Sequence, residues 1–154
     1  MPSRRSAIAM SDAELHRFLQ EERVVTVATI GPNGRPHLMP LWFVAEGSVV
    51  KGWTFGKSQK VKNLERDPRA TLQVEAGEQY QELRGAMLEC DVEIVRDLAA
   101  VTKIGTAVTC RYTGIPDDGD VPDMVKQQAP KRVGLIFRPT RVASWDHRKL
   151  GGGY

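Results

Sequence analysis

Apolar and polar residues alternate along two stretches in the middle of the chain, at residues 70–75 and 83–95. In the first stretch Leu72 and Val74 are each flanked by polar residues. In the longer stretch the apolar positions are Ala86, Leu88, Cys90, Val92 and Ile94. Because successive side chains of a strand point to opposite faces, this period of two predicts strands with one buried face. Such strands are typical of antiparallel sheets, and Cys90 is expected to pack in the core.

Three earlier stretches also predict strands, joined by tight turns. Residues 24–30 are rich in β-branched residues and apolar on both faces, which indicates a buried strand. The tetrapeptide Gly-Pro-Asn-Gly at 31–34 predicts a hairpin turn, since Asn and Gly tolerate a positive φ. Residues 35–44 return as a second strand and residues 49–55 form a third. We therefore expect the first three strands to form a meander.

The second of these strands contains Pro36 and Pro40, neither of which can donate a hydrogen bond to a neighbouring strand. A strand with prolines is expected at the edge of a sheet or at a bulge. Its backbone groups near residues 39–42 should then be free. Free backbone groups beside large apolar side chains suit a flat aromatic ligand.

Helical spacing of apolar residues predicts helices only at the periphery. Ser11 and Glu14 form a capping box that begins a helix over residues 12–22. Asp97 can cap a second helix, and a short third helix is expected over 123–128. The apolar face of the second helix is predicted to comprise Leu98, Val101, Val108 and Tyr112.

A last strand is predicted over residues 132–137, ended by Pro139, and residues 141–145 can extend the sheet. Six or more strands with helices at the edges predict a mainly β fold, an antiparallel barrel rather than a doubly wound parallel sheet. A chain of 154 residues suits a single domain. We place this domain at 11–150, between flexible tails at 1–10 and 151–154.

Charge is concentrated in one stretch, residues 54–69, which has five basic and two acidic residues. The basic residues are Lys57, Lys60, Lys62, Arg66 and Arg69. The whole chain has a net charge of +3, so an anionic small molecule is a plausible partner, while nucleic-acid binding is not favoured at this charge density. Two cysteines without C-x-x-C spacing and no stretch of membrane-spanning length predict a cytoplasmic protein with no membrane partner.

The same stretch predicts a corner between a strand and a helix. The strand is expected to end near Phe55, Gly56 to turn the chain, and a helix to run from about Ser58 until Pro68 stops it. Free backbone N–H groups, a hydroxyl group and mobile ammonium groups at such a corner suit a phosphate. We therefore hypothesise that this corner holds a phosphorylated cofactor; the alternative is a solvated face of a short charged helix.

Other kinds of site find no support in the sequence. No dinucleotide-binding or P-loop glycine motif occurs, and the three histidines lack the spacing of metal ligands, so we predict no metal site. The Ser-Trp-Asp-His segment at 144–147 does not favour a hydrolase triad, because adjacent residues of a strand point to opposite faces. The aromatic residues Trp42, Phe43, Trp53 and Phe55 can either fill the core or line a pocket.

Four segments, at 31–43, 57–71, 83–85 and 144–151, together resemble one protein family. They are similar to split β-barrel proteins related to pyridoxamine 5′-phosphate oxidase, and most of all to the actinobacterial flavin and deazaflavin oxidoreductases that bind coenzyme F420. The block at 57–71 carries most of the likeness. The resemblance implies a homodimer of six-stranded antiparallel Greek-key split barrels, with a cofactor groove at each end of the dimer interface.

The resemblance also implies roles for particular residues. Lys57, Ser58 and Lys60 would hold the cofactor phosphate, and Asn63 would support that loop. The ring system would lie beside Met39, Pro40, Leu41 and Trp42, with Thr54 on the neighbouring strand. Tyr80 is a candidate contributor from the other subunit.

The activity that the resemblance implies is hydride transfer between F420 and a small, apolar, electron-poor substrate. F420 carries an oligoglutamate tail that could occupy Lys62, Arg66 and Arg69, which FMN would leave without a partner. FMN nevertheless stays an alternative cofactor. No catalytic acid or base is predicted, because solvent, Tyr80 and His37 are equal candidates as proton donors. The rival interpretations are a protein that binds a cofactor or apolar ligand without turnover and a nucleic-acid-binding barrel.

Overall fold

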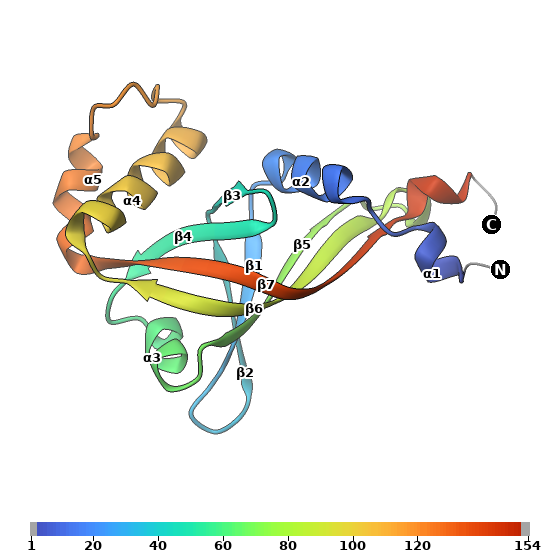
Figure 1. Ribbon diagram of the computed structural model, residues 1–154, viewed down its shortest axis with the longest axis horizontal. Coiled ribbons are helices and arrows are strands. Elements are labelled where there is room, and N and C mark those ends of the chain that lie inside the picture. The colour runs from blue at the N-terminus through green and yellow to red at the C-terminus, as the bar shows by residue number, and fades with distance from the viewer. Residues whose placement is uncertain (1–2, 152–154) are drawn as a thin grey trace.

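A computed structural model describes residues 3–151 as one curled antiparallel sheet with helices around it (Figure 1). The seven strands of the described residues lie in the order β2-β1-β5-β6-β7-β4-β3. They are β1 (Val25–Ile30), β2 (Pro36–Leu41), β3 (Val44–Glu46), β4 (Val49–Phe55), β5 (Arg69–Ala76), β6 (Arg84–Val95) and β7 (Arg132–Asp146). The predicted mainly β, antiparallel fold is confirmed, with one strand more than the six expected.

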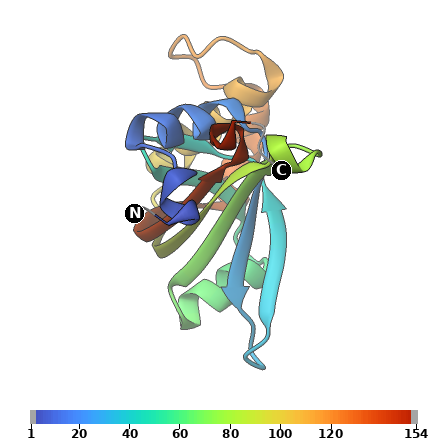
Figure 2. The same cartoon turned by 90° about the vertical axis from the view of Figure 1, so that its right-hand side faces the viewer.

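The helices lie at the ends and on one side of this sheet (Figures 1 and 2). They are α1 (Arg4–Ala7), α2 (Asp12–Glu21), α3 (Gln59–Arg66), α4 (Leu98–Thr113) and α5 (Asp123–Gln128). Residues 3–151 also contain three short 3₁₀-helices, η1 (Tyr80–Glu82), η2 (Ala129–Lys131) and η3 (His147–Leu150). The capping box of α2 is present, with the Ser11 hydroxyl accepting from Glu14 N at 3.2 Å.

The predicted meander is wrong. β1 and β2 form the expected hairpin, but β4 pairs with β7 and β3, so β2 and β4 lie toward opposite ends of the sheet order. The curl of the sheet nevertheless brings the end of β2 against the middle of β4. A Cβ atom on Gly52 would lie 2.7 Å from Leu41 Cδ2 and 3.1 Å from Trp42 O. The missing side chain at Gly52 therefore permits the two parts of the barrel to meet.

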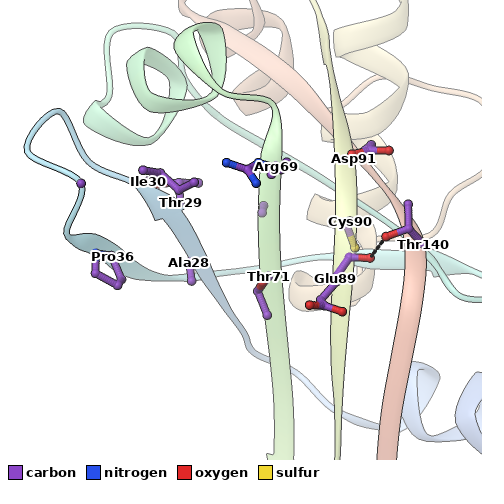
Figure 3. A pocket seen from close by; sticks show the side chains of 12 residues that line it. Ala28, Thr29, Ile30, Pro36, Arg69, Thr71, Glu89, Cys90, Asp91 and Thr140 are labelled. Atoms are coloured by element: carbon purple, nitrogen blue, oxygen red, sulfur yellow. Dashed lines mark hydrogen bonds between the residues drawn. The ribbon is translucent and has the colours of Figure 1, made fainter.

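The predicted end of the last strand at Pro139 is wrong, because β7 continues through this residue to Asp146, whereas the predicted extension of the sheet over 141–145 is confirmed. The register between β6 and β7 shifts at Glu89 and Cys90, opposite Pro139. There the Thr140 hydroxyl donates to Glu89 O at 3.1 Å, as the dashed line in Figure 3 shows. A bulge is one of the few places where a sheet tolerates the missing N–H of proline.

Two groups of buried side chains hold the fold together. The larger lies inside the curled sheet, between α2 and α3, and includes Phe18, Phe43, Leu72 and Phe137. The smaller lies between the outer face of β4 and the helices α4 and α5, and consists of Trp53, Val101, Ile104, Val108, Val125 and Ala129. Leu98 was expected on this apolar face, but it is 55% exposed, because it is the first residue of α4 and extends past the packed part of the helix.

The two ends of the described chain lie close together in Figure 1. Residues 3–10, expected to be a flexible tail, include α1 and two hydrogen bonds to β7. Ile8 O accepts from Asp146 N at 2.7 Å, and Met10 N donates to Ser144 Oγ at 2.9 Å. Residues 1–2 and 152–154 of the two expected tails lie outside the described residues. In the part of the chain that the structure describes, no helix is long and apolar enough to span a membrane.

Candidate functional site

The strand-to-helix corner has the predicted geometry. β4 ends at Phe55, and α3 begins after its N-cap residue, Ser58, and ends at Arg66. The Ser58 hydroxyl accepts from Val61 N at 3.4 Å, so it helps to cap its own helix. The backbone N–H groups of the first turn, at Gln59 and Lys60, have no acceptor within the helix. The corner therefore presents donors and a positive helix end, while Lys57 beside it is exposed.

Lys60 differs from the mobile surface cation that the sequence predicts. Its side chain is only 7% exposed, and its Nζ donates to Thr54 Oγ1 at 2.9 Å. No carboxylate within the described residues forms an ion pair with it. Burial, and to a lesser extent the nearby charge of Arg132, lowers the pKa of Lys60 below its ordinary value. A desolvated cation without a counter-ion is the arrangement that an anionic ligand would stabilise.

Asn63 connects the corner to the barrel wall. It is fully buried, and its side-chain amide donates to Thr29 Oγ1 of β1 at 3.0 Å. Its carbonyl oxygen accepts from Gln59 Nε2 at 2.8 Å. These contacts fix α3 against β1, which fits the supporting role that the family resemblance implies.

Two of the three additional cations of the corner already have partners. Arg69 forms an ion pair with Asp67 at 2.8 Å, and this contact lowers the pKa of Asp67 to about 2. Arg66 donates to the backbone carbonyl of Ile30. Lys62 is exposed and makes no ion pair within the described residues. Of the three cations predicted to contact an acidic tail, Lys62 is therefore the one that has no such partner within the described residues.

The proline-containing strand β2 lies at the edge of the sheet, as predicted. Met39 is 46% exposed and Trp42, just after the strand, is 52% exposed. The indole of Trp42 stacks on the ring of Tyr112 from α4, with centroids 4.5 Å apart and planes 7° from parallel. Phe43, by contrast, is fully buried, so the aromatic residues divide between pocket lining and core filling.

A pocket of about 570 Å³ adjoins these residues, between the end of β2, the outer face of β4 and the helices α4 and α5. It is lined by Val24, Pro40, Leu41, Trp42, Trp53, Val108, Thr109, Met124, Gln128 and Arg132. Arg132 is a residue that sequence reasoning missed. Its guanidinium lies 4.7 Å from the centre of the Trp53 ring, and its Nε donates to Gln128 Oε1 at 2.9 Å. Burial lowers its pKa.

Tyr80 is the first residue of η1, and the length of β5 separates η1 from α3 along the sheet. Its ring is tilted against His147, with centroids 4.6 Å apart, and its carbonyl oxygen lies 2.7 Å from His147 Nδ1. The structure does not bring Tyr80 to the corner within one chain. Its predicted role therefore requires a second subunit.

Three other candidates can now be placed. Cys90 is 3% exposed, and burial raises the pKa of its thiol to about 12, so it is an unreactive packing residue, as expected. His37 on β2 has a buried Nδ1 with no hydrogen-bond partner in the described residues. Among those residues no group of three or more His, Cys, Asp or Glu side chains could hold a metal ion.

A second pocket, of about 430 Å³, lies on the outer face of the sheet (Figure 3). Side chains of β1, β5 and β6 line it, among them Ala28, Thr71 and Glu89. Arg69, one of the cations expected to contact an acidic tail, lines this pocket, but none of the residues predicted to hold the phosphate or the ring system does. We therefore place the candidate site at the corner and at the pocket beside Trp42.

Comparison with known proteins agrees with this fold. The family model described as pyridoxamine 5′-phosphate oxidase matches residues 11–146. The chain belongs to the pyridoxamine 5′-phosphate oxidase family. This family includes oxidoreductases and, with the corner described above, makes a flavin-type cofactor the natural ligand class to consider. No curated protein gives a significant sequence match.

Solved structures include other proteins with this architecture. A conserved hypothetical protein from Mycobacterium tuberculosis is 42% identical, with a TM-score of 0.90, and the match covers 99% of this chain and 95% of that one. An F420 reductase is 24% identical, with a TM-score of 0.65, over 82% of this chain and 94% of that one. A FAD-binding protein from Mesorhizobium loti is 17% identical, with a TM-score of 0.66, over 88% and 93%. The last two share the fold.

Proposed function

We propose that this family member is an F420-dependent oxidoreductase that transfers a hydride between the deazaflavin and a small, apolar, electron-poor organic molecule. The observation that carries the proposal is the buried ammonium of Lys60, which has Thr54 as its neutral partner and no carboxylate within ion-pair distance among the described residues. Burying an uncompensated charge is costly, so proteins retain it where a ligand supplies the opposite charge.

The residues of the corner would bind the phosphate of the cofactor. Lys57 and Lys60 supply cations, and Ser58 and the first-turn N–H groups of α3 supply hydrogen-bond donors. The ring system would lie beside Met39, Pro40, Leu41 and Trp42, close to Thr54. When bound, the cofactor supplies the hydride chemistry; the protein orients it and excludes water.

F420 is our first choice of cofactor for two reasons. An F420 reductase is among the structures with this fold, and its name supplies a cofactor class to test. The exposed Lys62 beside α3 could also contact an acidic tail, which FMN lacks. FMN is the second candidate. Arg66 and Arg69 already have partners within the chain, so fewer cations are left for the acidic tail that distinguishes F420 from FMN.

The site is proposed to be complete only in a homodimer. Within its own chain Tyr80 is separated from α3 by the length of β5, and β2 is an edge strand that pairs on one side with β1 and has exposed apolar side chains such as Leu38. A second subunit would cover such a surface and bring Tyr80 of one chain to the corner of the other.

The test is a titration of the purified protein with F420 and, separately, with FMN, followed by tryptophan fluorescence. Trp42 and Trp53 lie beside the proposed ring site, so F420 is expected to quench their emission saturably. Reduced F420 is then mixed with a panel of quinones and activated alkenes, and its reoxidation is followed by absorbance. Tight binding of FMN alone would contradict the choice of F420, and binding without reoxidation by any acceptor would favour a non-catalytic binding protein.

A further inference from the structure

We propose that the pocket between β2, β4, α4 and α5 is the substrate compartment, and that it takes a planar apolar carboxylic acid whose carboxylate binds Arg132. This inference rests on the proposed function, since it places the substrate beside the stretch that would hold the cofactor ring. The pocket has a volume of about 570 Å³, which is in the range of small-molecule sites.

The walls of this pocket are apolar, and several of them are open to water. Val24, Trp42 and Met124 are 49%, 52% and 43% exposed, and all three line the same pocket. Trp53 and Val108 form its deeper wall. Large apolar side chains that gather around one concave surface are typical of a ligand site, because a ligand that covers them removes apolar area from water.

One wall is flat and held in place. Trp42 stacks on Tyr112, and the Tyr112 hydroxyl donates to Arg23 O at 2.6 Å. The same hydroxyl lies 3.1 Å from Phe43 N, which donates to it, so the residue after Trp42 is fixed as well. A fixed aromatic plane favours a flat ligand over a bulky one.

The polar end of the pocket has a cation with unused donors. Arg132 Nε donates to the neutral side chain of Gln128, and within the described residues its two terminal nitrogens make no hydrogen bond and no ion pair. The guanidinium fork fits a carboxylate through two parallel hydrogen bonds. Arg132 is paired with Phe55, and the next pair in the sheet is Val133 with Thr54. Neighbouring pairs point to opposite faces, so Arg132 and Thr54 lie on opposite faces of the sheet. Thr54 is the hydrogen-bond partner of Lys60. The two cations therefore lie on different sides of β4, Lys60 at the phosphate corner and Arg132 at the pocket, although Arg132 is near enough for its charge to lower the pKa of Lys60.

The position of the pocket connects it to the proposed chemistry. Pro40, Leu41 and Trp42 line the pocket and are also the stretch predicted to lie beside the cofactor ring. A ligand anchored at Arg132 would extend across Trp53 toward this stretch. The protein would thus select a substrate by its apolar planar body and its terminal carboxylate.

The test uses 2-naphthoate as the probe and naphthalene-2-carboxamide as its uncharged match, with binding measured by equilibrium dialysis. Wild-type protein is expected to bind the carboxylate about 10-fold more tightly than the amide, because charge-assisted hydrogen bonds are the stronger kind. Arg132→Gln is expected to remove this preference and Arg132→Lys to retain part of it. Arg141→Gln removes an exposed cation elsewhere on β7 and serves as the matched control. Equal affinity for the two probes, or an unchanged preference in Arg132→Gln, would overturn the proposal.

A parallel arm separates this proposal from the proposed function. F420 binding is measured on the same variants, with thermal melts to show that each is folded, and naphthoate binding is repeated at saturating F420. Persistence of Arg132-dependent naphthoate binding supports the substrate compartment, whether or not F420 binds. If naphthoate binding depends on Arg132 but F420 does not bind, only the proposed function is contradicted. If F420 displaces naphthoate, and Arg132→Gln weakens F420 binding as much as naphthoate binding, then Arg132 binds the cofactor and the inference is wrong.

Discussion

The ammonium group of Lys60 lies where water barely reaches it, hydrogen-bonded to Thr54 at 2.9 Å. The sequence predicts this cation at the corner, because Lys60 follows Ser58 by two residues and therefore lies in the first turn of the predicted helix. It does not predict that the side chain turns inward, because that direction depends on a hydroxyl of the preceding strand and on the closure of the barrel around both. Arg132 was missed for a similar reason: no local pattern connects it to Trp53 or Gln128.

The burial of Lys60 predicts a dependence of stability on pH. Its pKa is lowered in the folded state, so the unfolded chain binds more protons between that pKa and the ordinary value of 10.5. The free energy of unfolding should therefore rise as pH increases through this window. The same stability is lost as pH decreases to the folded pKa. Lys60→Met lacks the titrating group and should lack this rise. Urea unfolding of both proteins between pH 7 and 10.5 measures the difference, and parallel curves would contradict it.

At the scale of single elements, α4 is positioned by the close contact of Gly105 with Trp53. A Cβ atom at Gly105 would lie 2.5 Å from Trp53 Cε3. The indole is rigid, so either Trp53 or the helix would have to move to relieve this clash. Gly105→Ala is therefore expected to destabilise the protein by about 1–3 kcal/mol, although alanine favours a helix more than glycine does. Chemical denaturation measures the change. Lys103→Ala, on the exposed face of the same helix, should change stability little; equal effects of the two would argue against the contact.

The start of α2 predicts a different dependence on pH. Glu14 accepts from Lys149 at 2.8 Å and from Ser11 N, and these hydrogen bonds, that of Lys149 first, lower its pKa from 4.5 to about 2. A lowered carboxylate pKa contributes stability above pH 4.5 that is lost as pH falls toward 2. Thermal melts of Glu14→Gln should therefore show a weaker decline over that range than wild type. Glu75→Gln, which removes an exposed carboxylate on β5, should retain the wild-type decline.

Most elements follow from local signals in the sequence. The capping box of α2, the bounds of β4, the start of α3 near Ser58 and the alternation of β5 were all predicted and are confirmed. The errors concern relations between elements. The meander failed because the pairing of β4 with β7 joins residues far apart in the chain, and Pro139 did not end β7 because a bulge absorbs it.

At the scale of the whole molecule, the curl of the sheet assembles the site. The end of β2 meets Gly52 of β4, although the two strands do not pair, and this contact brings residues 40–42 near Thr54. The grouping of these residues in the sequence-based prediction came from the family resemblance. Local periodicity alone does not yield it, since closure depends on the twist of seven strands.

The proposed homodimer is a prediction at this same scale. Light scattering after size-exclusion chromatography should give a mass of about twice the 17.1 kDa of one chain. Leu38→Asp places a charge on the exposed edge strand, where Leu38 is 60% exposed, and should shift the protein toward the monomer. Asp117→Asn, at an exposed position between α4 and α5, should leave the mass unchanged. A monomeric wild type that binds F420 fully would contradict the shared site.

The central claim is that the corner binds the phosphate of F420 through Lys57 and Lys60, and calorimetric titration with F420 tests it most directly. Lys57→Ala with Lys60→Met should weaken F420 binding by about 100-fold or more, since the variant loses two charge-assisted hydrogen bonds and each contributes about 1.5–3 kcal/mol. Arg138→Gln, which removes an exposed cation of β7 away from the corner, should bind F420 as wild type does. Unchanged affinity in the folded double variant would contradict the account.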